Sequence, residues 1–141
     1  MLAELRRAVE GLDIGVDGDA IAEVLALRSL LDARLAAAIG AFDRAKLWDL
    51  DGHTSMVAWL RDNGDISRRE AARMTSSAAR VSKLPVLAAA WADGTLSGGQ
   101  VEAVVANLRP HTIETFAAQE AELVPALAPL SVADTARAMG T

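Results

Sequence analysis

The residues that could do chemistry in this 141-residue chain are few. It has two histidines, His53 and His111, and no cysteine, which excludes disulfides, thiolate metal sites and a cysteine nucleophile. A catalytic triad needs a nucleophile, a base and an orienting group, and no pattern in the sequence assembles the three. The chain also lacks the glycine-rich phosphate loops of nucleotide-binding proteins. We therefore expect no catalytic residue, no bound metal and no cofactor.

One acidic turn has a faint similarity to a calcium-binding loop. Asp49, Asp51 and His53 alternate around Gly52. The glycine is misplaced for such a loop, however, and Leu60 stands where the closing glutamate belongs. Aspartates in turns commonly accept hydrogen bonds from nearby backbone N–H groups. We interpret this segment as a capped turn and not as a metal site.

Basic side chains gather in one segment of an otherwise acidic chain. The formal net charge is −5, yet residues 67–92 carry five basic residues and one acidic residue. On a helix, four of the cations and one serine fall within about 80° of arc, opposite a set of apolar residues that would pack inward. The inward set is Ala71, Met74, Ala78 and Val81. The outward set, which we call the basic face and which includes Arg68 at its edge, is Arg68, Arg69, Arg73, Ser76, Arg80 and Lys83.

The elements that must position these residues are predicted to be helical throughout. Apolar residues make up 52% of the chain, good helix formers dominate, and no alternating strand pattern is visible. Segment 19–47 predicts a long spine helix of about 40 Å. Its apolar positions at helical spacing are Ile21, Val24, Leu27, Leu31, Leu35, Ala38 and Phe42. The three tryptophans, Trp48, Trp59 and Trp91, are expected to anchor the core.

Capping residues and helix breakers set the other boundaries. Residues 2–10 predict a short helix before a glycine- and aspartate-rich loop. Ser67 and Glu70 are spaced as a capping box, in which each side chain binds the other residue's backbone N–H. Further helices are predicted over 54–63, 67–83, 85–93, 97–108, 112–127 and 131–141. The expected fold is an all-α bundle of about seven helices with helix-turn-helix-like pairs.

Four segments of the sequence occur in an order that is informative when they are taken together. They are Asp51–Arg61, Ile66–Arg73, Ala79–Pro85 and Trp91–Val101. In this order they resemble the domain of unknown function 222 (DUF222), the mycobacterial REP-repeat family of actinobacteria and mycobacteriophages. That family's domain precedes HNH endonuclease domains, so the resemblance implies an all-helical accessory domain over residues 1–141, in the N-terminal part of a longer protein. The nuclease's His-Asn-His site does not fit within this chain, and the resemblance carries over no catalytic residue.

The sequence gives no sign of a membrane protein. The longest apolar stretch, Leu35–Phe42, has about eight residues, whereas a membrane-spanning helix needs about 20. The first residues lack the apolar segment of a signal peptide. We therefore expect a cytoplasmic protein without membrane contact.

Two functions are compatible with the sequence. Cations along a helix can follow a phosphate backbone, so the basic face predicts contact with duplex DNA, which the module would position for an HNH nuclease. Alternatively, the long helix pairs with a second copy or with the nuclease domain. Exposed, unpaired arginines favour DNA, whereas pairing with Glu102, Glu120 or Glu122 would make the basic face internal scaffolding. An apolar stripe left exposed on the long helix would favour association.

Overall fold

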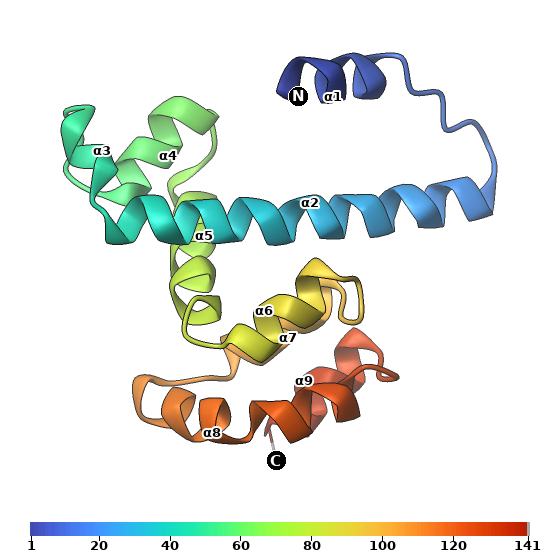
Figure 1. Ribbon diagram of the computed structural model, residues 1–141, viewed down its shortest axis with the longest axis vertical. Helices are drawn as coiled ribbons and strands as arrows, with labels where there is room; N and C mark the ends of the chain where they lie inside the picture. Colours follow the sequence, from blue (N-terminus) through green and yellow to red (C-terminus); the bar gives the residue numbers. More distant parts are fainter. Residues whose placement is uncertain (141) are drawn as a thin grey trace.

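Nine helices and no strand make up residues 1–140, the part of the chain that this computed structural model describes (Figure 1). The helices are α1 (Leu2–Glu10), α2 (Gly18–Arg44), α3 (Leu47–Leu50), α4 (Met56–Gly64), α5 (Arg68–Val81), α6 (Pro85–Ala92), α7 (Gly98–Ala106), α8 (Pro110–Leu127) and α9 (Val132–Gly140). The all-α class is confirmed, and the count is close to the expected seven. The predicted spine helix ends earlier than expected because Lys46 adopts a left-handed φ of 52°, which separates α3 from α2.

The long helix α2 extends across the molecule, and the other helices lie to either side of it (Figure 1). The carboxylate of Asp17 accepts a hydrogen bond from the backbone N–H of Asp19 and so caps its first turn. α1 precedes α2, lies above it in this view and runs in the opposite direction (Figure 1). None of the residues of α1 is buried, so this helix adds nothing to the core.

Two apolar clusters form the core. The larger one joins α6, α7 and α8, with Ala33 of α2 at its edge. The smaller one joins α2, α4 and α5 through Ile39, Met56, Leu60, Ala71 and Ala78. α5 packs against α2, α4 and α7, and therefore connects the two clusters. Its predicted inward side is confirmed, because Ala71, Ala78 and Val81 are buried and Met74 packs against the smaller cluster.

The three tryptophans take different places. Trp91 is buried in the larger cluster, as expected. Trp48 and Trp59 are half-buried beside the smaller cluster, and each indole N–H donates to a carboxylate. The Nε1–O distances are 3.0 Å from Trp48 to Asp43 and 2.7 Å from Trp59 to Asp51. The acidic turn thus holds the indole of Trp59 in place, and the end of α2 holds that of Trp48.

A buried glutamine connects the last three helices. Gln100 forms a capping box with Ser97 at the start of α7. Its Nε2 donates to the carbonyl oxygens of Leu127 at 2.8 Å and Leu130 at 2.9 Å, and to Oγ1 of Thr135 at 3.3 Å. Because these acceptors belong to the end of α8, the following turn and α9, one side chain fixes the packing of all three helices.

A buried carboxylate caps α6 from another helix. Residue Leu84 precedes α6 and offers no side-chain cap. Oε1 of Glu120, on α8, instead accepts a hydrogen bond from the backbone N–H of Leu87 at 2.8 Å. A carboxylate near a helix N-terminus is favoured by the helix dipole. Glu120 is therefore part of the scaffold and does not contact the basic face.

Two pairs of consecutive helices are joined by short turns, α4 with α5 and α6 with α7. α6 and α7 are joined by a turn in which Gly94 has a φ of +84°, a conformation that favours glycine. α7 then begins with Gly98 and Gly99, where backbone and side chains approach closely. A Cβ on Gly99 would lie 2.8 Å from Cγ2 of Val132. Within residues 1–140, no helix is both long and apolar enough to cross a membrane.

Candidate interaction surfaces

The basic face begins where Ser67 caps α5. Its Oγ accepts a hydrogen bond from the backbone N–H of Glu70 at 3.1 Å, as predicted. The reciprocal half of the predicted capping box is wrong, because the Glu70 carboxylate binds the guanidinium of Arg73. A charged partner one turn away attracts the carboxylate more strongly than a neutral backbone N–H does.

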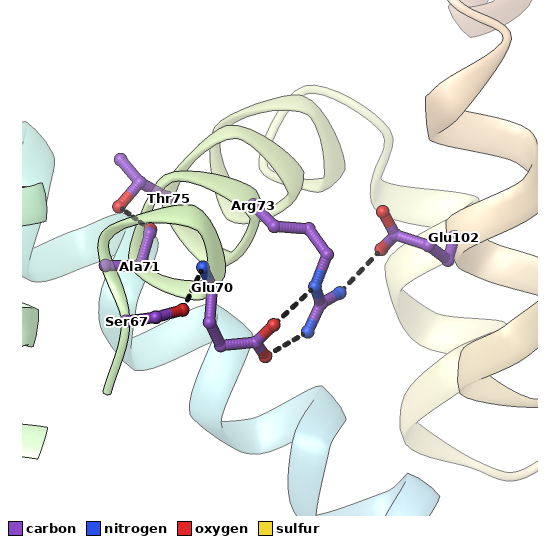
Figure 2. A network of polar contacts seen from close by, with 6 residues as sticks. All are labelled: Ser67, Glu70, Ala71, Arg73, Thr75 and Glu102. Atoms are coloured by element: carbon purple, nitrogen blue, oxygen red, sulfur yellow. Dashed lines mark hydrogen bonds and ion pairs between the residues drawn. The ribbon is translucent and has the colours of Figure 1, made fainter. Parts of the chain in front are cut away.

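Arg73 lies between two carboxylates (Figure 2). Its Nε is 3.0 Å from Oε2 of Glu70, and its Nη1 is 3.2 Å from Oε2 of Glu102 on α7. The hydrogen bonds between Arg73 and Glu70 raise the pKa of the guanidinium and lower the pKa of the carboxyl. Arg73 therefore connects α5 to α7, and its charge is neutralised within the molecule.

Arg80 also binds α7. It is half-buried, and its Nη1 donates to the carbonyl oxygen of Val105 at 3.0 Å. Val105 lies in the last turn of α7, where its carbonyl oxygen also accepts the backbone N–H of Leu108 and where a cation is favoured. Two of the five cations of the basic face thus fasten α5 to its neighbour.

The remaining residues of the basic face point to solvent. Arg68, Arg69, Ser76 and Lys83 are exposed, and their side chains have no partner among the described residues. The sequence pattern could not separate these two groups, because the partners of Arg73 and Arg80 lie on α7, far along the chain. The basic face therefore divides into two arginines that bind neighbouring groups of the protein, Arg73 and Arg80, and a free, more sparsely charged set.

A pair of substitutions on α5 tests this division. Replacement of Arg73 by Ala should lower the free energy of unfolding by about 1 kcal/mol, a small value because water screens its half-exposed ion pairs. The lowered pKa of Glu70 means that this contribution is present at neutral pH and is lost as the pH falls through that pKa. Replacement of Arg69 by Ala should change unfolding by less than about 0.5 kcal/mol. Urea denaturation at pH 7 measures both, and equal losses would contradict the division.

The second candidate surface is on α2. Three of its leucines at helical spacing do not face the core. Leu27, Leu31 and Leu35 are 52%, 51% and 44% exposed. At 100° per residue they lie opposite Ala33 and Gly40, which are buried against the other helices. We call the outward set of Val24, Leu27, Leu31, Leu35 and Ala38 the α2 ridge.

α1 has an uncovered apolar side of its own. Leu2, Leu5 and Val9 are spaced to share one side of the helix, and they are 76%, 43% and 60% exposed. Soluble monomers rarely leave contiguous apolar patches in water unless the patch meets a partner. The first 35 residues thus contain most of the exposed large apolar side chains of the described chain.

The side chains of the acidic turn around His53 are bound within the protein. Nε2 of His53 lies 3.0 Å from Oδ2 of Asp62, and Asp51 is occupied by the indole of Trp59. Among residues 1–140, no three His, Cys, Asp or Glu side chains gather in a way that could hold a metal ion. The polar side chains of this turn are therefore hydrogen-bonded to neighbouring residues of the same chain.

Comparison with known proteins identifies a family. A family model described as a domain of unknown function (DUF222) matches residues 19–139. The match begins at the start of α2 and leaves α1 outside. No curated protein and no solved structure matches the chain.

Proposed function

The chain belongs to the DUF222 family of domains of unknown function, and from this premise we propose that it is a non-catalytic module that pairs with a second copy of itself through the α2 ridge. The observation that carries the proposal is the exposure of Leu27, Leu31 and Leu35 at about half of their surface each. Burial of one such leucine contributes about 1.5–3 kcal/mol. The exposed leucines of α2, the longest helix of the fold, are therefore available to a partner.

The spacing of the ridge supports a second copy as that partner. Its residues follow one another at intervals of three, four, four and three positions, so the pattern is the same in both chain directions. Two antiparallel α2 helices related by a two-fold axis at Leu31 place Leu27 of one copy against Leu35 of the other. Val24 then meets Ala38. An interface of this kind is self-complementary, as a two-fold dimer requires.

The chemistry of the ridge is also suitable for helix pairing. All five of its residues are uncharged and apolar, so pairing buries no unpaired charge. Intervals of three and four are those by which side chains of one helix fit between side chains of another. The charged residues of α2 lie outside the ridge.

Sedimentation equilibrium tests the proposal on the whole chain. We expect a reversible monomer–dimer equilibrium with a dissociation constant of about 1–10 µM. A monomer at all concentrations up to about 1 mM would overturn self-association and leave the ridge to a different protein. Larger, open-ended assemblies would overturn the two-fold arrangement.

DNA contact is a second candidate, favoured by the exposed and unpaired Arg68, Arg69 and Lys83. With three phosphate contacts, the logarithm of the binding constant for duplex DNA should fall against the logarithm of salt concentration with a slope of about −2.7. Fluorescence anisotropy measures this slope, and substitution of all three residues by Ala should abolish it. Equal binding by both proteins at low salt would reject this candidate.

A further inference from the structure

Two aromatic rings lie together near the end of α2, beyond the α2 ridge. The rings of Phe42 on α2 and Trp59 on α4 have centroids 4.7 Å apart, and their planes are inclined by 48°. Both side chains are half-buried beside the smaller cluster. The hydrogen bond from Nε1 of Trp59 to Asp51 fixes the indole in place. We call Phe42 and Trp59 the aromatic pair, which presents a rigid and partly exposed apolar surface.

A large aliphatic side chain is exposed at the opposite end of α2. Ile21, in the first turn of the helix, is 46% exposed. It precedes Phe42 by 21 positions, which separates the two side chains by about 30 Å along the helix. Viewed along the helix at about 100° per residue, both are rotated in the same direction from Leu31, by about 80° and about 20°. Ile21 and Phe42 therefore flank the ridge on the same side but cannot meet within one chain.

The α2 ridge alone gives a small interface. Its three half-exposed leucines supply at most about 300 Å² of apolar surface, whereas each partner of a stable interface buries about 800 Å². Val24 is already half-buried and Ala38 is small, so these residues add little. A dimer that forms at micromolar concentrations therefore needs further apolar contacts beside the ridge.

The two-fold arrangement proposed above brings the two ends of α2 together. With the axis at Leu31, Ile21 lies ten positions before the axis and faces the position ten after it in the second copy, which is next to Phe42. The axis is perpendicular to both helices. Residues that flank the ridge on one side in the first copy therefore meet residues that flank it on the same side in the second. Ile21 of one copy thus reaches the aromatic pair of the other, and this contact occurs twice in the dimer.

From this geometry we infer that Ile21 of each copy docks on the aromatic pair of a second copy and closes the interface at both ends of the α2 ridge. The inference rests on the proposed self-association. The contact joins an aliphatic side chain to two rings, and tryptophan is among the residues that contribute most to protein interfaces. Leu25 is also exposed on this half of α2, but it is rotated by about 120° from Leu31 and points away from the second copy.

A nuclear Overhauser effect (NOE) between the Ile21 methyl groups and the ring protons of the aromatic pair tests the contact in the unsubstituted chain. These groups are about 30 Å apart within one chain, so the NOE can only arise between two chains. We expect it at concentrations at which the protein is a dimer, and we expect none from the Leu25 methyl groups. A dimer in sedimentation equilibrium without this NOE would overturn the contact and leave pairing through the α2 ridge in place. A monomer at all concentrations would overturn both.

Matched substitutions measure what the contact contributes. Ile21→Ser should raise the dissociation constant of the dimer about tenfold, whereas Leu25→Ser should change it by less than about twofold. Because both side chains are about half exposed in the single chain, both variants should keep the circular dichroism of the unsubstituted protein. An unchanged dissociation constant in Ile21→Ser, or equal effects of the two substitutions, would overturn the inference.

Discussion

Leu31→Glu is expected to convert the dimer into a monomer. Leu31 lies at the proposed two-fold axis, so one substitution places two carboxylates against each other in an apolar interface. The loss of two buried leucines and the proximity of like charges should weaken association at least about 100-fold. Because Leu31 is 51% exposed in the single chain, the fold itself should be unaffected. Sedimentation equilibrium and circular dichroism measure the two effects.

The matched control for this variant is Leu50→Glu. Leu50 is also a large exposed leucine, at 81%, but it lies on α3 and outside the α2 ridge. It should leave the dimer intact. Equal weakening by both substitutions would mean that association is nonspecific, and no weakening by Leu31→Glu would remove the ridge from the interface.

The second large effect is expected inside the fold, at Gln100. Gln100→Leu keeps the approximate size of the side chain but removes its donor and acceptor. The carbonyl oxygens of Leu127 and Leu130 then lose their shared donor, and the N–H of Ser97 loses its acceptor. Because these groups are buried or partly buried, the free energy of unfolding should fall by about 3 kcal/mol. Urea denaturation at neutral pH measures the change.

Gln119→Leu provides the comparison for Gln100. Gln119 lies on α8 and is exposed, and its side chain has no hydrogen-bond partner in the described chain. Its replacement should change the free energy of unfolding by less than about 0.5 kcal/mol. If Gln100→Leu were equally mild, the three helices would be held by apolar packing alone.

Much of the fold could be predicted from local signals. Serine caps, prolines and glycines mark helix ends through hydrogen bonds and backbone geometry within a few residues of the boundary. Ser67 caps its helix as its position indicates, and Ser55 and Ser97 cap α4 and α7 in the same way. The inward side of α5 follows equally directly, because its apolar residues share one side and its charges the other.

The side of α2 that faces the core could not be predicted in the same way. Leu27, Leu31 and Leu35 form a regular stripe, yet the core takes the opposite side, where Ala33, Ile39 and Gly40 are buried. A Cβ on Gly40 would lie 3.5 Å from the carbonyl oxygen of Ala78, which shows how closely α5 approaches. Such close packing depends on a helix almost 40 positions away, and helical periodicity carries no information about it. The periodicity locates an apolar side but does not identify its partner.

The candidate sites depend on similar long-range contacts. The sequence places Arg69, Arg73 and Arg80 on one side of a helix, and they do share it. Whether a cation is free depends on carboxylates and carbonyl oxygens that other helices bring near, here from α7.

The most direct test of self-association through the α2 ridge uses one cysteine. The natural chain has none, so Leu31→Cys introduces the single thiol of the protein. Disulfides need Cα atoms about 5.5–6 Å apart, which antiparallel helices reach at a two-fold axis. We predict rapid, nearly complete formation of a covalent dimer under mild oxidation, with Leu50→Cys remaining monomeric under the same conditions. Slow or equal cross-linking of the two variants would contradict pairing at Leu31.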